Sequence, residues 1–160
     1  MQMNKLTNKL NSQKGQSGFT IIEVLIVLAI GALIILAVLL AVPALQNNQR
    51  NSARKADASR IASALTAWAS DNNNAALTGA TAAEITTRAN VGNSQLRTVN
   101  APTATVPAAD KLPTTINNAY IYVSASCVGT TPTTLATADN TRAVVYYVND
   151  GGGSACVTAN

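Results

Sequence analysis

The sequence predicts an α+β protein in which one long N-terminal α-helix, with a transmembrane half and an amphipathic half, packs on a small C-terminal antiparallel β-sheet. Three observations carry this prediction. Residues 24–42 form an apolar run without a charge, residues 46–72 place apolar side chains at helical spacing, and residues 119–160 contain short alternating segments rich in Val and Tyr. The total of 160 residues is the size of one ordinary domain.

The charge of the chain lies mostly at its N-terminus. The net charge is +4, from 11 Lys and Arg against 7 Asp and Glu. Lys5, Lys9 and Lys14 lie within residues 1–18, which contain no acid, so residues 19–160 are nearly neutral. The chain contains no histidine, which excludes most Ser/His, Cys/His and zinc chemistry. Because no cluster of titratable groups lies outside the helix, we expect no enzyme and no cofactor.

Residues 19–45 are predicted to insert into a membrane. They carry one charge, Glu23, and the uncharged run after it would span about 28 Å as a helix, close to the ~30 Å hydrocarbon core of a bilayer. A buried helix of a globular protein is the alternative, but the remaining residues are too rich in Ala and Thr to surround so long an apolar rod. A cleavable secretory signal is also disfavoured, because its apolar region is normally about 7–15 residues long.

Two residues are expected to weaken this helix locally. Pro43 has no N–H to donate to the carbonyl of Leu39, so a kink is expected there. Gly31 is a second weak point. Gly31 and Pro43 are therefore the candidate positions for bending or for local loss of helicity.

Residues 46–72 are predicted to continue the helix, with one stripe of side chains facing the sheet. The stripe consists of Ala53, Ala56, Asp57, Ile61, Ala64, Leu65 and Trp68. Arg54, Asp57 and Arg60 follow one another at steps of three, so they are expected to pair along the exposed side. The helix should end at the Asn-rich run of residues 71–74.

The basic side chains of this helix have two interpretations. Arg50, Arg54, Lys55 and Arg60 either contact DNA or form a solvated face or subunit contacts. The second interpretation is favoured, because no aromatic residue is interleaved for base stacking and residues 19–160 are nearly neutral. DNA is therefore the less favoured partner.

Residues 73–118 are predicted to form a variable region of short helix and loop. Thr81 and Glu84 have the spacing of a capping box, which predicts a short helix near residues 82–90. Pro102, Pro107 and Pro113 then break up the loop that follows.

Residues 119–160 are predicted to form the sheet. One strand is expected over residues 119–128, with Ile121, Val123, Ala125 and Cys127 on one face. Further strands are expected over residues 143–148 and 155–158, on either side of a turn at residues 149–153.

No metal site is assigned. A calcium ion needs several oxygen ligands that converge on it. The candidate ligands are too sparse to provide them: Asp139, Asn140, Asn149 and Asp150.

The segment from Lys14 to Glu23 carries the most specific pattern. It has the sequence KGQSGFTIIE, in which a basic leader ends at Gly18, Phe19 follows, and Glu23 lies four residues further on, ahead of the apolar run. This pattern resembles the prepilin signal, or class III signal sequence, of type IV pilins and of the pseudopilins of type II secretion. The resemblance implies a cleavable leader at residues 1–18. It also implies that a prepilin peptidase cuts between Gly18 and Phe19 and N-methylates the new amino terminus of Phe19.

The same resemblance implies how the subunit assembles. Glu23 would neutralise the Phe19 amine of a neighbouring copy, so that this charge pair sets the register of a helical filament. In such filaments the stretch between Gly31 and Pro43 can lose helicity. The implied partners are other copies of this chain, the prepilin peptidase, the pilus assembly machinery and the cytoplasmic membrane that holds the subunit before assembly.

Orientation also rests on the resemblance, because basic residues lie on both sides of the apolar run and the positive-inside rule does not decide between them. The leader would stay in the bacterial cytoplasm, and the C-terminal part would face outward in a single-pass precursor and then in an extracellular pilus. The implied function is that of a structural subunit of a type IV pilus for adhesion and twitching motility. A pseudopilin of a type II secretion or DNA-uptake system and a monomeric membrane-tethered adhesin are the alternatives.

Cys127 and Cys156 are the two cysteines of the chain. In an exported domain with a small Ala-rich core, a disulfide between them is expected, and many pilins close a C-terminal region in this way. Two buried free thiols are the alternative.

Overall fold

The structure, a computed structural model, describes residues 18–129, 134–137 and 142–159. The chain divides into two units, residues 1–42 and residues 43–160. We call residues 43–160 the head; it contains the C-terminal part of the long helix and every strand that the structure describes. The predicted division of the chain into five functional segments stays a prediction.

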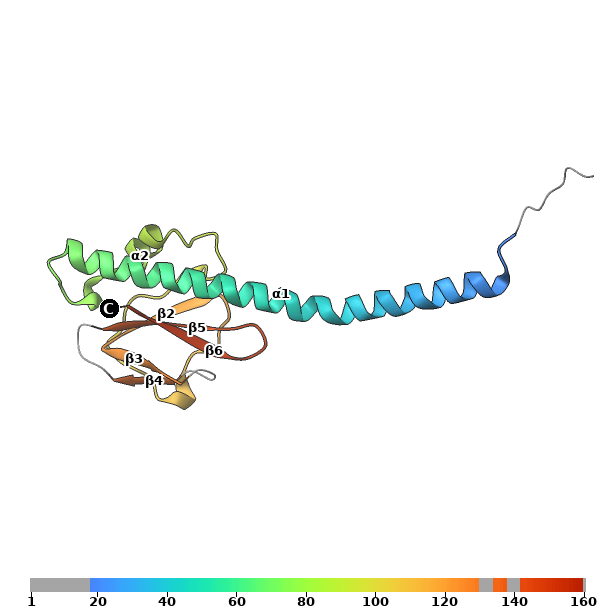
Figure 1. Cartoon of the computed structure of the whole chain (residues 1–160). Coiled ribbons are helices and arrows are strands. Elements are labelled where there is room, and N and C mark those ends of the chain that lie inside the picture. The colour runs from blue at the N-terminus through green and yellow to red at the C-terminus, as the bar shows by residue number, and fades with distance from the viewer. Residues whose placement is uncertain (1–17, 130–133, 138–141, 160) are drawn as a thin grey trace, which may run out of the picture. The chain divides into compact units, whose positions relative to one another are not determined.

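The longest element is helix α1, which spans Ile21–Asp71 (Figure 1). The predicted long N-terminal helix is confirmed, although it begins two residues after Phe19. It continues through Pro43, which lies inside it. Asn73 and Asn74 follow with φ of 53° and 58°, a left-handed conformation that Asn adopts more readily than most residues. The Asn-rich run therefore ends the helix, as predicted.

The head contains a four-stranded sheet in the order β1-β2-β5-β6. These strands span Thr98–Val99, Asn118–Val123, Ala143–Val148 and Ser154–Ala159. β1 runs parallel to β2, whereas the β2–β5 and β5–β6 pairs are antiparallel. The sheet is therefore mostly antiparallel with one parallel edge strand. The strands predicted near the C-terminus correspond to β5 and β6.

A second sheet pairs β3, Ala125–Val128, with β4, Thr134–Thr137. Within the head, α1 covers one face of the four-stranded sheet, and β3 and β4 lie on the opposite side (Figure 1). The central strand β5 is buried along its whole length because both faces of the sheet are covered. A strand buried on both faces reads as a continuous apolar run, which explains the sequence AVVYYV.

Two clusters of apolar side chains hold these layers together. In the first, Ile61, Leu65 and Trp68 of α1 pack against strand residues that include Ile121 and Val145. The second lies on the other face of the sheet and contains Tyr122, Ala125, Val144, Tyr146 and Val148.

Burial, together with the neighbouring tyrosines, raises the pKa of Tyr122 to about 12. This hydroxyl stays protonated across the physiological pH range.

The single strand predicted over residues 119–128 is wrong, because the structure breaks it at Ser124. Ser124 has a φ of 57°, a left-handed conformation that interrupts the ladder. β2 before it pairs with β5, whereas β3 after it pairs with β4. The break also changes which side of the sheet the alternating apolar side chains face. Ile121 and Val123 face the first cluster, but Ala125 and Cys127 join the second.

The region of residues 73–118 contains helix α2, Ala82–Ala89, and two short 3-10 helices at Leu77–Gly79 and Ala109–Lys111. The predicted capping box is confirmed, since Thr81 accepts a hydrogen bond from the Glu84 N–H and the Glu84 side chain accepts one from the Thr81 N–H. These bonds from Thr81 hold the pKa of Glu84 below its ordinary value. Asn90 ends the helix in the left-handed conformation.

A disulfide joins Cys127 of β3 to Cys156 of β6, with a Cα–Cα distance of 6.1 Å. The predicted disulfide is therefore present, and it links the two sheets beside the second cluster. It closes a loop between residues 29 positions apart. On the chain-entropy argument, such a closure contributes about 3–4 kcal/mol to the free energy of unfolding.

Replacing both cysteines, Cys127→Ser and Cys156→Ser, should lower the free energy of unfolding by about 3–4 kcal/mol. Urea unfolding of the full chain in a mild detergent measures this, with the fluorescence of Trp68, the one tryptophan of the chain, as the signal. As the control, dithiothreitol should destabilise the wild-type chain by a similar amount and leave the double variant unchanged. Equal unfolding midpoints for the oxidised wild type and the variant would contradict the prediction.

Candidate functional site at the start of the long helix

The bond between Gly18 and Phe19 lies outside the helix. Residues 18–20 precede the first turn of α1, and the Phe19 side chain is 88% exposed. A protease binds its substrate in an extended conformation, which a helix cannot offer. The predicted cleavage position is therefore placed in accessible, non-helical backbone. Lys5, Lys9 and Lys14 of the predicted leader lie outside the described residues.

Thr20 and Glu23 form a capping box at the start of α1. Glu23 Oε2 accepts hydrogen bonds from the Thr20 N–H at 2.9 Å and from the Thr20 hydroxyl at 2.8 Å, and the Glu23 N–H donates to Thr20 Oγ1 at 3.3 Å. The box satisfies two of the N–H groups that every helix start leaves without partners. This capping box is not among the predictions from the sequence, although Thr20 and Glu23 have the same spacing as Thr81 and Glu84.

The capping box leaves part of the Glu23 carboxylate available. Both hydrogen bonds from Thr20 go to Oε2, and Oε1 has no hydrogen bond within the part of the chain that the structure describes. A carboxylate has lone pairs for several donors. Glu23 can therefore keep its own helix capped through one oxygen and accept a cation from another molecule through the other.

Steric contacts within the chain do not require a glycine at position 18 or at position 31. A Cβ atom added to either residue meets nothing within 4 Å, apart from the neighbouring residues and the backbone of its own helix turn. Close packing inside this chain therefore does not explain the two glycines. The constraint on them would come from another molecule or, for Gly31, from the weak helix propensity of glycine.

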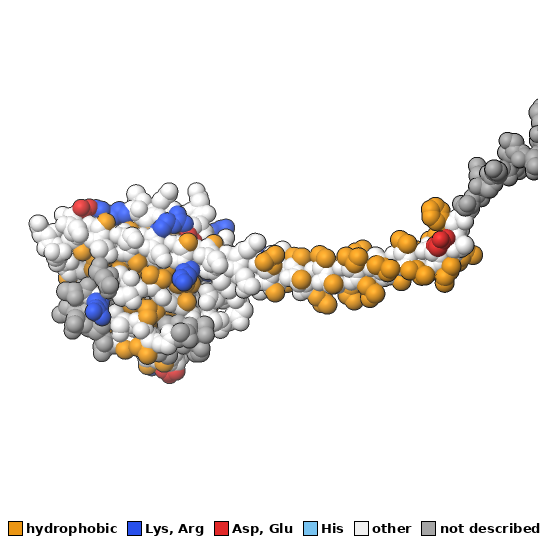
Figure 2. Space-filling view, in the orientation of Figure 1, with side chains coloured by type: hydrophobic (Ala, Val, Ile, Leu, Met, Phe, Trp, Pro, Cys, Tyr) orange, Lys and Arg blue, Asp and Glu red, His pale blue; other side chains and the backbone are white. Residues whose placement is uncertain are grey.

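The N-terminal part of α1 presents apolar side chains to its surroundings. Figure 2 shows hydrophobic side chains along this part of the helix, and the large side chains between Ile21 and Leu45 are exposed. Among the described residues, α1 is the one helix that is long and apolar enough to cross a membrane. Water is a poor solvent for such a surface. This surface needs lipid or other apolar helices around it.

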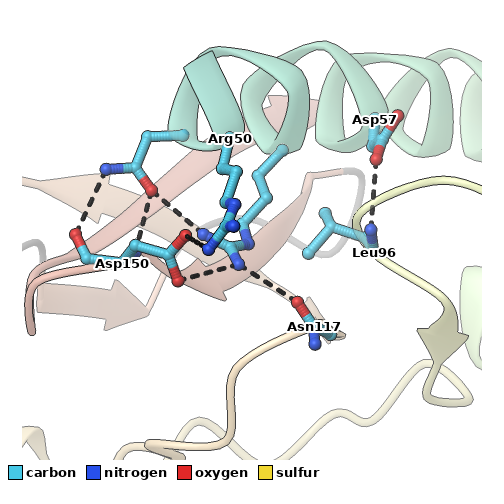
Figure 3. Close-up of polar contacts among 7 residues, drawn as sticks. Arg50, Asp57, Leu96, Asn117 and Asp150 are labelled. Carbon is cyan, nitrogen blue, oxygen red and sulfur yellow. Dashed lines mark hydrogen bonds and ion pairs between the residues drawn. The ribbon is translucent and has the colours of Figure 1, made fainter. Parts of the chain in front are cut away.

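The basic residues of α1 do not form a continuous patch. Arg54 is only 2% exposed, whereas Arg50 is 54% exposed. Arg54 Nη2 lies 3.0 Å from Asp150 Oδ1 and donates a hydrogen bond to it, and the same nitrogen donates to Asn117 at 3.1 Å. Figure 3 shows Arg50, Asp150 and Asn117 grouped at the surface of α1 that faces the head. The arrangement weakens the DNA interpretation, since its central arginine is buried.

The prediction that Arg54, Asp57 and Arg60 pair along the exposed side of the helix is wrong, because Arg54 and Asp57 are buried. Asp57 is also only 2% exposed, and its Oδ2 accepts the backbone N–H of Gln95 at 2.8 Å. The same oxygen accepts the backbone N–H of Leu96 at 3.1 Å (Figure 3). Arg60 pairs with the other carboxylate oxygen of Asp57. Arg54 and Asp57 therefore attach α1 to loops of the head, a role that no local sequence pattern indicates.

No group of three or more His, Cys, Asp or Glu side chains gathers as metal ligands in residues 18–129, 134–137 and 142–159. Asp150 is paired with Arg54 and lies 3.8 Å from Arg50. Asp139 and Asn140 lie outside the described residues.

Residues 13–39 match the prokaryotic N-terminal methylation motif, the class III signal sequence of type IV pilins. The match includes Gly18, Phe19 and Glu23, and it ends before the head begins. No curated protein and no solved structure matches the chain. The match confirms the resemblance found in the sequence. It supports a type IV pilin-like or pseudopilin protein, and therefore a structural protein with a membrane-anchored precursor.

Proposed function

We propose that this chain, which carries the N-terminal methylation motif, is the structural subunit of a type IV pilus that serves adhesion and twitching motility. The observation that carries the proposal is the matched motif, together with an accessible bond between Gly18 and Phe19 directly ahead of an apolar helix. The disulfide in the head favours a pilus subunit over a pseudopilin, because an exposed surface filament needs a resistant outer domain.

The proposed sequence of events starts in the cytoplasmic membrane. A prepilin peptidase hydrolyses the bond between Gly18 and Phe19, and a methyl group is transferred to the new amine of Phe19. Residues 19–45 stay in lipid until the subunit is added to the filament, where the same surface packs against other copies. This order removes three lysines before assembly, so the assembled chain is nearly neutral.

Glu23 sets the register of each added subunit. The amine of Phe19 is a cation next to an apolar surface, and an unpaired charge there is costly. The Glu23 carboxylate of a neighbour supplies the counter-charge through Oε1 while Oε2 keeps the capping box with Thr20. A subunit in the wrong register would bury both charges without partners.

The test is N-terminal mass spectrometry of filaments sheared from cells that express the chain with a prepilin peptidase. We expect filaments whose chains begin at N-methylated Phe19, and we expect Gly18→Val to leave the full-length chain in the membrane, because a branched side chain blocks the protease. Gly92→Val is the matched control, since an added Cβ at Gly92 also meets nothing within 4 Å. Filaments made of chains that begin at Met1 would refute the proposal.

Electron microscopy of the same cells separates the pilus from the alternatives. Filaments that extend far beyond the cell surface support a pilus subunit. Short fibres confined to the envelope indicate a pseudopilin of a secretion or DNA-uptake system, and the absence of any fibre with normal processing indicates a membrane-tethered monomer.

A further inference from the structure

A pocket lies in the head where α1 meets the end of strand β5. Its volume is about 360 Å³. The side chains that line it offer hydrogen-bond donors: Asn48, Asn51, Ser52 and Lys55 of α1, Tyr147 of β5, and Asn149 of the turn that follows. None of the described residues that line it carries a carboxylate. The pocket therefore suits an anionic group with several acceptor oxygens.

The wall of this pocket is held in place by its own hydrogen bonds. Asn51 donates to the backbone carbonyl of Asp150 at 3.2 Å and accepts the Asp150 N–H at 2.8 Å. The Asn149 N–H donates to the carbonyl of Gly153 at 2.7 Å, which closes the turn. Arg54 adds an ion pair to Asp150 at 3.0 Å. These bonds fix the Asn51 side chain and the turn at residues 149–153, which together form one wall of the pocket.

Of the four charged groups on this part of α1 and the adjoining turn, only Lys55 lines the pocket, and the four together are positive. Arg50, Arg54 and Lys55 contribute three positive charges, and Asp150, the acid paired with Arg50 and Arg54, contributes one negative charge, so these four groups sum to +2. The Arg54 guanidinium already pairs with Asp150 inside the protein and is therefore not available to a ligand. Lys55 is exposed and forms no ion pair with any residue that the structure describes, so its ammonium group is available to a ligand.

The sequence position of the pocket places it next to a membrane surface. Its α1 residues follow Leu45, the end of the predicted membrane segment, by three to ten positions, which is about 5–15 Å of helix. The headgroup layer of one leaflet is roughly 5–8 Å thick. Side chains on a helix point toward its N-terminus, here toward the lipid, and the flexible stem of a lysine extends that reach.

We propose that this pocket binds the phosphate headgroup of an anionic phospholipid while the subunit waits in the membrane. The inference rests on the proposed function, because it requires residues 19–45 to insert into a bilayer. Lys55 supplies the charge, and the amide and hydroxyl groups supply hydrogen bonds to the phosphate oxygens. The contact holds the head at the bilayer surface and must be given up when the subunit leaves the membrane for the filament.

The test uses the full-length chain purified in dodecyl maltoside and supplied with phosphatidylglycerol or with phosphatidylcholine. Native mass spectrometry measures the fraction of protein that retains one lipid. The variants are Lys55→Gln and the matched control Lys111→Gln, which removes the same charge from an exposed lysine of the short helix Ala109–Lys111, outside the pocket. Co-sedimentation of each protein with phosphatidylcholine vesicles reports membrane insertion separately.

We expect Lys55→Gln to weaken phosphatidylglycerol retention by about fivefold relative to the wild type and to Lys111→Gln. Phosphatidylcholine retention should change less, because the choline cation of that lipid already balances the charge of its phosphate. Equal retention of the two lipids by the wild-type chain would overturn the inference, and so would an equal effect of the two variants. If all the proteins sediment with vesicles in that case, membrane insertion stands and only the headgroup site fails. If the wild type does not sediment, both the site and the proposed membrane precursor fail.

Discussion

Glu23→Ala should give a chain that is processed and inserted into the membrane but forms almost no filaments. The cleavage position does not include Glu23, so removal of residues 1–18 should continue. Assembly, by contrast, would bury the Phe19 amine of each subunit without a counter-charge. Removing one member of a buried ion pair costs about 3–5 kcal/mol. This corresponds to a decrease of more than about 100-fold in the equilibrium constant for assembly.

The Ala variant alone does not separate two functions of Glu23, since it also removes the capping box with Thr20. Glu23→Gln keeps the capping box, because Gln forms it as well as Glu, and removes only the charge. Thr20→Val does the reverse. It keeps the charge and removes the hydroxyl that donates to Glu23 at 2.8 Å.

Counting filaments by electron microscopy and measuring the processed fraction by mass spectrometry distinguishes these effects. If the charge sets the register, Glu23→Gln behaves like Glu23→Ala, and Thr20→Val still assembles. If Glu23→Gln makes filaments in wild-type numbers, the charge pair is not the determinant of assembly. The helix cap would then explain the loss in the Ala variant.

The helices of this molecule could be predicted from sequence because their signals are local. The length of the apolar run, the order of Gly18, Phe19 and Glu23, and the spacing of Thr81 and Glu84 are all contained in short segments. Each acts through neighbouring residues, as helix caps and membrane-spanning runs do. The long helix, its end at the Asn-rich run and helix α2 follow from such signals, and the structure contains all three.

The head was harder to predict, because its organisation depends on contacts between distant segments. Arg54 is separated by 96 positions from Asp150 and by 63 from Asn117. Asp57 binds the backbone of Leu96, 39 positions away. A charged residue at a buried helix position has the same sequence signature as one on the exposed face. The i, i+3 spacing of Arg54, Asp57 and Arg60 therefore suggested a solvated pairing.

Ser124 shows a second limit of sequence reasoning. The alternation of residues 119–128 continues unchanged across it, and Ser is not a residue that marks a left-handed turn as Gly or Asn does. The turn is imposed by the tertiary structure, in which β2 pairs with β5 and β3 must reach β4. Cys127 consequently points to the second cluster, where it meets Cys156 of β6.

Arg54→Met should lower the free energy of unfolding by about 3–5 kcal/mol, because it leaves Asp150 without its main partner. The Arg54 guanidinium makes hydrogen bonds to Asn51, Asn117 and Asp150, all between 3.0 and 3.1 Å. Those bonds join α1 to the start of β2 and to the turn between β5 and β6. Met preserves the apolar part of the side chain, so the expected loss is that of the charge and its hydrogen bonds.

Urea unfolding in detergent, followed by the fluorescence of Trp68, measures this loss, with Arg97→Met as the control. Arg97 is exposed, and a substitution at such a site should change stability by less than about 0.5 kcal/mol. Arg54→Lys should be intermediate, since an ammonium keeps the charge but cannot bond three acceptors in the geometry of a guanidinium. Arg54→Met with a stability equal to that of Arg97→Met would contradict the prediction.

The double variant Arg54→Met with Asp150→Leu distinguishes a stabilising ion pair from a specific attachment. Replacing a whole buried pair by apolar side chains is often neutral, whereas removing one member is costly. We therefore expect the double variant to recover most of the stability that Arg54→Met loses. The turn at residues 149–153 would still lose its charged anchor, because Asn51 alone would hold the Asp150 position through its backbone. If Arg54 also positions the pocket wall, the double variant should retain less phosphatidylglycerol than the wild type even when its stability is restored. The buried pair is then selected for the geometry that it imposes on the head.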